Sequence, residues 1–86
     1  MSRLARLWDT VNHSLESPWT IDRLARAAHM SREHLRRVSL AETGRAPMQH
    51  VAHLRIQRAM DLLLSSERTV EAVAEAVGYS NPFVFS

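Results

Sequence analysis

The stretch TIDRLARAAHMSREHLRRVSLAETG, residues 20–44, decides the fold that this sequence predicts. Thr20 is a favourable N-cap, and Trp19 before it is placed to pack on Leu24 as a hydrophobic staple. Apolar residues then recur at helical spacing over residues 21–28. A short amphipathic helix is therefore expected there.

A second helix is predicted directly after the first, over residues 31–43. Ser31 is placed to cap its start, and Gly44 to take the left-handed conformation that ends many helices. Two short helices joined by a tight turn form a helix-turn-helix, whose second helix enters the major groove of DNA. The side chains off the apolar face of this second helix are mostly cationic: Arg32, Glu33, Arg36 and Arg37.

The composition fits one small helical domain. The chain has 86 residues, 45% of them hydrophobic, with 2 Gly and 3 Pro. It has no Cys, which removes disulfides and thiolate metal sites. No apolar run approaches the roughly 18 residues of a membrane span, and no signal peptide opens the chain, so a cytoplasmic location is expected. All 11 basic residues are arginine, which suits contacts to phosphate and guanine, although a solvated surface explains this composition equally well.

Hydrophobic periodicity extends the helical pattern on both sides of the motif. An amphipathic segment precedes it and stops at Ser17-Pro18, since the residue before proline is pushed out of the helical region. Pro47 opens a long helix that would measure about 27 Å at 1.5 Å per residue. The fold is therefore predicted to be all-α. The expected helices lie near residues 3–16, 21–28, 31–43, 47–64 and 70–77, with a last turn after Pro82.

One cation interrupts the apolar stripe of the long helix. The stripe comprises Met48, Val51, Ala52, Ala59, Leu62 and Leu63. Arg55 falls in its middle, where an unpaired charge is costly to bury, so it must reach solvent, a carboxylate or helix-end carbonyls. We expect a structural anchor. The first candidate partners are Asp22, Glu71 and Glu75.

The first half of the motif recurs later in the chain. TVEAVAEAVGYS, residues 69–80, repeats TIDRLARAAHMS, residues 20–31, which predicts two copies of one supersecondary unit. Gly78 stands at the turn position that His29 holds in the first copy. A histidine with positive φ costs roughly 1 kcal/mol there. After residue 80 the second copy starts its own second helix, and the sequence ends about one turn later.

Together these features resemble the DNA-binding domain of the AraC/XylS family of bacterial transcription regulators. The resemblance extends over roughly residues 4–86. It rests on WTIDRLARAAHMSREHLRR, ETGRAPMQHVAHLRIQRAMDLL and TVEAVAEAVGYSNPFVFS. It implies two homeodomain-like helix-turn-helix units joined by a long linker helix, with both second helices in successive major-groove segments.

The resemblance also implies a domain organisation and a function. Residues 1–45 would form the first unit, residues 46–66 the linker helix, and residues 67–86 an incomplete second unit. The expected function is sequence-specific DNA binding by a transcription regulator, a bacterial activator, with residues 31–43 in the major groove. Double-stranded DNA is the expected partner, and no catalytic residue, cofactor or metal is expected.

Matching the family motif residue by residue gives a set of candidate DNA contacts. Contacts to bases are assigned to Glu33, Arg36, Arg37 and Ser86, and contacts to phosphates to Thr20 and Arg32. Arginine can grip guanine O6 and N7, and glutamate can accept from cytosine N4. Phosphate contacts set the register of the protein without reading sequence.

The sequence departs from the family pattern at three places. Ser39 stands where an aromatic residue is usual, His29 replaces the usual turn glycine, and the second recognition helix lacks its C-terminal half. We therefore expect this chain to bind DNA more weakly and less selectively than a version extended past Ser86. We also expect exposed core around Val73, Val77 and Phe85, which would favour dimerisation or aggregation.

Other kinds of site are less well supported by the sequence. His50 and His53 share one helical face, but no third metal ligand is indicated nearby. Trp8 and Trp19 are expected in the core rather than as stacking platforms. The remaining alternative is a protein-interaction module that binds RNA polymerase or a full-length regulator without tight DNA binding. Basic side chains clustered over residues 32–37 would favour DNA, and a broad exposed apolar patch would favour a protein partner.

Overall fold

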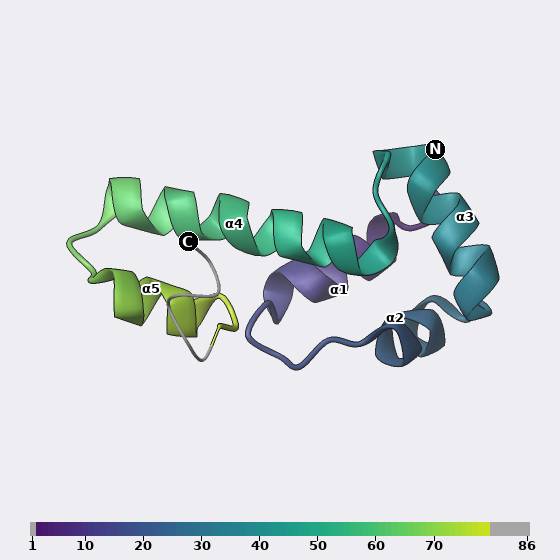
Figure 1. Ribbon diagram of the computed structural model, residues 1–86, viewed down its shortest axis with the longest axis horizontal. Coiled ribbons are helices and arrows are strands. Elements are labelled where there is room, and N and C mark those ends of the chain that lie inside the picture. The colour runs from purple at the N-terminus through teal and green to yellow at the C-terminus, as the bar shows by residue number, and fades with distance from the viewer. Residues whose placement is uncertain (1, 80–86) are drawn as a thin grey trace.

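Five helices make up the part of the chain that the structure describes, residues 2–79 of a computed structural model (Figure 1). They are α1 (Ala5–His13), α2 (Ile21–Ala28), α3 (Arg32–Thr43), α4 (Pro47–Ser65) and α5 (Val70–Ala76). No strand occurs within these residues, so the predicted all-α fold is confirmed. The last turn predicted after Pro82 lies outside the described residues.

The first helix is shorter than the predicted 3–16. It ends at His13, and Ser14 leaves the helical region with φ −145° and ψ 52°. The Ser14 carbonyl then accepts from the Ser17 N–H at 3.1 Å and from the Trp19 indole N–H at 2.8 Å. Because these bonds pair the Ser14 carbonyl outside a helix, the chain after His13 forms a non-helical turn, and α1 does not continue.

The predicted start and stop signals of the first helix-turn-helix are confirmed. The Thr20 hydroxyl accepts from the Arg23 N–H at 3.1 Å, which caps α2. The Ser31 hydroxyl accepts from the His34 N–H at 3.1 Å, which caps the start of α3. Gly44 ends α3 with φ 75°. Trp19 and Leu24 are buried in one core cluster, as the hydrophobic staple requires.

Both copies of the repeat make the same turn. His29 has φ 56° and Gly78 has φ 101°, so both residues are left-handed. In each copy this residue donates to the carbonyl three positions earlier, and the next residue donates to the carbonyl five positions earlier. The distances are 3.2 and 3.0 Å after α2, and 3.2 and 2.8 Å after α5. The internal repeat is thus a repeat of backbone geometry, in which His29 takes a conformation that favours glycine.

Ser39 forms a polar tie between α3 and the connector to α4. It is fully buried, and its hydroxyl donates to the Arg45 carbonyl at 2.7 Å. The Thr43 hydroxyl donates to the Ser39 carbonyl at 2.8 Å. The position that carries an aromatic ring in the family pattern therefore carries a hydrogen bond here.

Two separate hydrophobic cores lie along α4. The larger core joins α1, α2 and α3 to the first half of α4, and Val51 is its fully buried contribution from α4. The smaller core consists of Ala59, Val73 and Val77, with Leu62 and Tyr79 packed against it. α4 thus contributes to both cores. In Figure 1 it runs from the end of the molecule that holds α3 to the end that holds α5.

The exposed core expected around Val73 and Val77 is not found. Both side chains are fully buried, because they pack on Ala59 of α4. Phe85 lies outside the described residues. Exposed apolar side chains occur elsewhere, around the end of α4 and the start of α5, at Met60, Leu63, Leu64 and Val70.

The buried stripe of α4 is narrower than predicted. Ala52 is exposed and Leu63 is 38% exposed, whereas Val51 and Ala59 are fully buried. Ala52 and Leu63 fall at the edge of the stripe on a helix with 3.6 residues per turn, and the packed helices cover only its centre.

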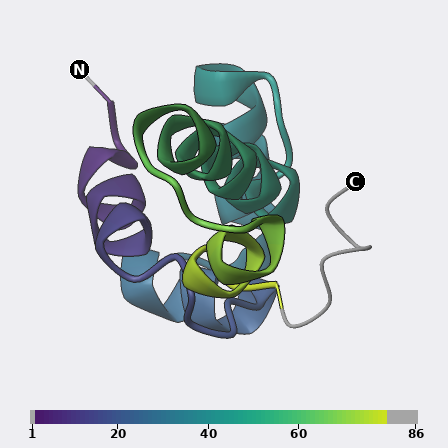
Figure 2. The same cartoon turned by 90° about the vertical axis from the view of Figure 1, so that its left-hand side faces the viewer.

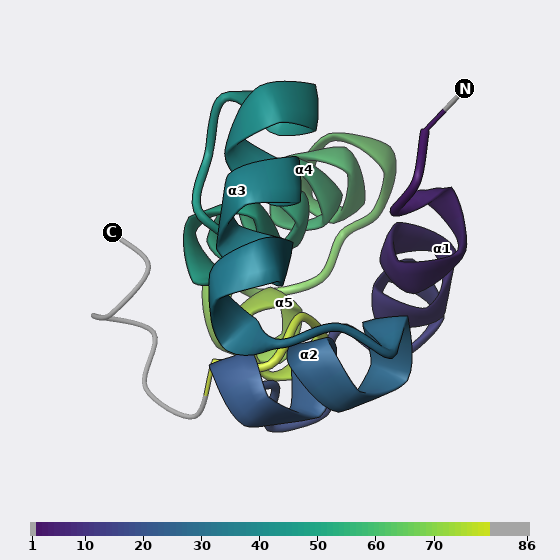
Figure 3. The ribbon, with the colours of Figure 1, turned by 90° about the vertical axis from the view of Figure 1, so that its right-hand side faces the viewer.

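The helices are arranged so that α1 and α3 lie on opposite sides of the molecule. The two end-on views show α4 between them (Figures 2 and 3). The molecule is elongated, with extents of 40 × 24 × 19 Å. Among the described residues, no helix is both long and apolar enough to cross a membrane.

Candidate nucleic-acid interface

The outer face of α3 carries three of the predicted base-reading side chains. Glu33, Arg36 and Arg37 are all exposed, while the opposite face of the helix is buried in the larger core. Within residues 2–79, none of the three side chains makes a hydrogen bond or ion pair. The structure thus brings these three predicted residues together on one exposed face, where their charged groups are available to a partner. Ser86, the fourth, lies outside the described residues.

The start of α3 is tied to α2 by an ion pair. Arg32 Nε lies 2.7 Å from Asp22 Oδ1, and the two side chains are 67% and 56% exposed. At this exposure the pair contributes little to stability, roughly 0–1 kcal/mol. Its geometric effect is to hold the Arg32 guanidinium at the edge of the α3 face.

Thr20 lies at the start of α2, the position predicted for a phosphate contact. Its oxygen accepts from the Arg23 N–H, so this bond does not use its hydroxyl proton. Arg23 lies over the Trp19 ring at 4.8 Å and donates to the Pro18 carbonyl at 3.1 Å. A hydroxyl and a cation therefore stand side by side at this helix start.

Two hollows flank α3 and make it a ridge. One, of about 360 Å³, is lined by Ile21, Arg32, Glu33, Arg36, Ala46, Pro47 and Met48. The other, of about 420 Å³, is lined by Arg3, His34, Arg37, Val38, Ala41 and Glu42. A ridge with hollows on both sides is a shape that can enter a groove of DNA about 12 Å wide.

The sequence analysis missed the contact between the N-terminal segment and α3. The Glu42 carboxylate accepts from the Ser2 hydroxyl at 2.7 Å and from the Arg3 N–H at 2.6 Å. These hydrogen bonds, the Arg3 bond foremost, hold the pKa of Glu42 below its ordinary value. Arg3 also lies 3.0 Å from His34 Nε2, which adds a cation beside α3. No local pattern signals a pairing across about forty residues of sequence.

Arg55 is a structural anchor, as predicted, and of the predicted kinds of partner it uses backbone carbonyls; the carboxylates named as first candidates are wrong. Its guanidinium donates to the carbonyls of Leu15 and Ser17, at 3.0 and 2.9 Å. Asp22 instead pairs with Arg32, and neither Glu71 nor Glu75 is bonded to Arg55. The carbonyls that follow α1 offer acceptors without the cost of dehydrating a carboxylate.

Trp8 and the histidine pair meet where α1 packs on α4. Trp8 and Trp19 are each 9% exposed, which confirms the prediction that they are core residues. His50 packs edge-on against Trp8 with ring centres 4.5 Å apart, and the rings of His50 and His53 are 5.8 Å apart. The described residues contain no group of three side chains that could hold a metal ion.

His50 is expected to make the stability of the domain depend on pH. Burial, together with the nearby charges of Arg45 and His53, holds the pKa of His50 below its ordinary value. As pH falls below the ordinary histidine pKa of about 6.5, the unfolded chain takes up this proton first, so stability decreases. Urea unfolding at pH 7.5 and 5.5 should show a larger loss for the wild type than for His50→Gln. Equal losses would show that His50 does not contribute.

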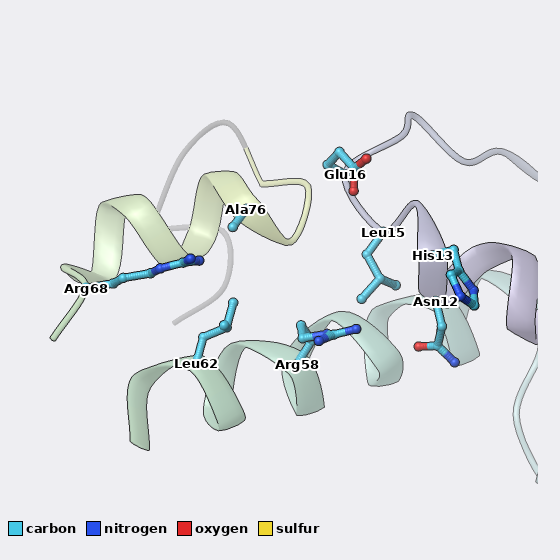
Figure 4. Close-up of a pocket in the computed structure, with 8 residues that line it drawn as sticks. All are labelled: Asn12, His13, Leu15, Glu16, Arg58, Leu62, Arg68 and Ala76. Carbon is cyan, nitrogen blue, oxygen red and sulfur yellow. The ribbon is translucent and has the colours of Figure 1, made fainter. Parts of the chain in front are cut away.

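A third groove lies away from the α3 ridge. It occupies about 250 Å³ between α1, α4 and α5, and Figure 4 shows the residues that line it. Leu15 points from the chain after α1 toward α4 (Figure 4). Arg58 of α4 and Arg68, which lies just before α5, also line the groove. None of its lining residues belongs to α3, so this groove is not part of the ridge.

A capped helix pair with an exposed cationic second helix defines a helix-turn-helix DNA-binding domain. A family model described as a helix-turn-helix domain matches residues 24–86, more than half of the chain. The MmsAB operon regulatory protein of Pseudomonas aeruginosa is 42% identical over 66 residues, which cover 77% of this chain and 22% of that protein. The transcriptional regulator MtrA of Neisseria gonorrhoeae is 35% identical over 79 residues, covering 92% of this chain and 26% of that protein.

Two solved structures share the fold. The DNA-binding domain of AdpA, in complex with a target DNA, superposes with a TM-score of 0.89 at 29% identity, covering 99% of this chain and 77% of that one. An AraC-type regulator from Chromobacterium violaceum gives a TM-score of 0.88 at 26% identity, covering 98% and 75%. The chain belongs to the AraC/XylS family of transcription regulators. It spans about a quarter of the length of the two curated relatives.

Proposed function

We propose that this chain binds DNA sequence-specifically by inserting α3 into the major groove. The observation that carries the proposal is the exposed ridge of α3, where Glu33, Arg36 and Arg37 are free of partners among the described residues. Arg36 and Arg37 are the guanine readers, and Glu33 accepts from cytosine N4. Ser86 is the base contact that we propose from the second unit.

Phosphate contacts on either side of the ridge would set its register. We propose Thr20 and Arg32 for this role, because the Thr20 hydroxyl proton is free of the capping bond and Arg32 is held at the ridge edge by Asp22. Such contacts strengthen binding to every sequence alike. The chain then works as the DNA-binding part of a bacterial transcription activator in the cytoplasm, since relatives include the lactose operon transcription activator of Staphylococcus xylosus.

We propose a domain organisation in which the first unit and the second unit are joined by the long helix α4. Residues 1–45 form the first unit, residues 46–66 the linker helix, and residues 67–86 belong to the second unit. The two cores along α4 support this division. The homologous AdpA domain was solved with a target DNA, which supports the use of this fold on duplex DNA.

The test measures how single arginines contribute to binding. Duplexes are selected from a random pool by the chain itself, and binding is titrated at two salt concentrations. Arg36→Ala or Arg37→Ala should each cost about 1–3 kcal/mol and relax preference at one base pair. Arg32→Ala should weaken all sequences alike and reduce the salt slope by about one. Arg58→Ala, which removes an exposed arginine that lines the groove between α1, α4 and α5, is the matched control.

A protein-interaction module is the second candidate, and one observation favours it. Met60, Leu63, Leu64 and Val70 are exposed around the end of α4 and the start of α5. Such apolar side chains suit a protein partner, which in this reading is RNA polymerase, a full-length regulator or a second copy of the chain. If Arg36→Ala and Arg37→Ala both bind every selected duplex as the wild type does, α3 is not the reader. If the wild type itself selects no duplex from the pool, this second candidate replaces the first.

A further inference from the structure

Arg55 stands at the boundary between the two hydrophobic cores. Val51 belongs to the larger core and Ala59 to the smaller one, and Arg55 lies one turn from each on the same side of α4. The smaller core is therefore connected to the larger one through α4 and through the residues that contact the Arg55 side chain.

One side of the guanidinium holds the chain that follows α1. Nε donates to the Leu15 carbonyl at 3.0 Å, and a terminal nitrogen donates to the Ser17 carbonyl at 2.9 Å. Leu15 is 3% exposed, so this contact is largely shielded from water. Two donors in a rigid planar fork fix the direction of the side chain as well as its position.

The other side of the guanidinium meets the turn after α5. The Tyr79 ring centre lies 5.6 Å from the guanidinium carbon, within the range of a cation–π contact. A Cβ built on Gly78 would lie 3.0 Å from Arg55 Nε and 2.6 Å from the Leu15 carbonyl oxygen. The backbone of Gly78 therefore closes on the same carbonyl that Arg55 binds, and three segments of the chain converge here.

We propose that Arg55 is a positioning residue that fixes the second helix-turn-helix unit relative to the first. It does so by joining the segment after α1, the middle of α4 and the turn after α5. The geometry it holds sets the spacing at which two DNA segments can be bound together, and this last step rests on the proposed function. Without the fork, the second unit is held to the first by α4 and by the approach of Gly78 to Leu15.

The variants separate the fork from the charge. Arg55→Gln removes both the cation and the planar fork. Arg55→Lys keeps the charge but presents a single ammonium group, which cannot reproduce the two directed hydrogen bonds. Arg58→Gln is the matched control, because it removes an exposed arginine of α4 that makes no hydrogen bond or ion pair within residues 2–79.

The first measurement needs no DNA. The chain contains no Cys, so spin labels can be attached at Ala27→Cys on α2 and Ala72→Cys on α5, both exposed positions. The wild type and Arg58→Gln should give one narrow distance distribution, and Arg55→Gln a broad or shifted one, with Arg55→Lys between them. Circular dichroism checks that each variant is folded, and Arg55→Lys carries the test if Arg55→Gln unfolds. A distribution in the folded Arg55 variants that is as narrow as in the wild type and centred at the same distance would overturn the proposal.

The second measurement uses duplexes selected by the chain, with the distance between the two recognised segments changed one base pair at a time. The wild type should prefer one spacing, and Arg55→Gln should lose about tenfold or more of this preference while binding a single segment as before. If the wild type binds no duplex, the proposed function fails while the label distances still decide the role of Arg55. If Arg55→Gln keeps the spacing preference, Arg55 does not position the units even though the chain binds DNA.

Discussion

Leu35→Ala is expected to remove a large part of the stability of this domain. Leu35 is fully buried in the core that α3 shares with α1, α2 and α4. Truncating such a leucine removes buried apolar surface and leaves a cavity, at a cost of about 2–5 kcal/mol. Because small domains are stable by only about 5–15 kcal/mol, this loss is a large fraction of the total, and the variant should unfold at a clearly lower urea concentration.

The matched control for this change lies on the same helix. Leu40 is 38% exposed on the outer side of α3, so Leu40→Ala makes the same chemical change outside the core. Equilibrium unfolding in urea, followed by the fluorescence of Trp8 and Trp19, reports directly on the larger core. Leu40→Ala should cost less than about 1 kcal/mol. Similar losses for the two variants would mean that α3 is not packed through Leu35.

Gly78→Ala is expected to cost more than the same change at Gly44. Both glycines have positive φ, 75° at Gly44 and 101° at Gly78, so both alanines pay for a left-handed backbone, about 1 kcal/mol or more. At Gly44 a new Cβ meets nothing within 4 Å. At Gly78 it would lie 2.6 Å from the Leu15 carbonyl oxygen, which is backbone and is also held by Arg55.

The difference between the two glycine variants is the measured quantity. Forcing the Gly78 backbone away from Leu15 should add roughly 1–3 kcal/mol to the cost of the left-handed alanine. Amide hydrogen exchange should show lost protection in α5 for Gly78→Ala, and no such loss for Gly44→Ala. If both variants lose the same stability, the close approach of Gly78 to Leu15 does not contribute to folding.

The parts of the fold that follow from neighbouring residues were predictable from the sequence. Thr20, Ser31 and Gly44 act within one helical turn, and each has the capping geometry that its residue type predicted. The repeat predicted the matching turns at His29 and Gly78, because the same local pattern requires the same backbone path. The exposed face of α3 followed from helical periodicity in the same way.

The parts that depend on contacts far apart in sequence were not predictable. The sequence placed Arg55 in the apolar stripe and offered helix-end carbonyls among its acceptors, but it did not identify Leu15 and Ser17, because a backbone carbonyl carries no residue signature. The same holds for Glu42, whose carboxylate binds backbone and hydroxyl groups of residues 2–4. The burial of Val73 and Val77 depended on how closely α5 approaches α4, which periodicity alone does not specify.

Because α4 runs unbroken between the two cores, the number of residues between them sets how the two cores are rotated relative to each other about the helix axis. Each residue of an α-helix advances the chain by 1.5 Å and turns it by about 100°. One residue inserted between Val51 and Ala59 would therefore rotate the smaller core by about 100° relative to the larger one while lengthening the molecule very little. The connector at residues 66–69 carries no such constraint, since it lies outside the helices. Insertions and deletions should therefore be tolerated better in that connector than in the middle of α4.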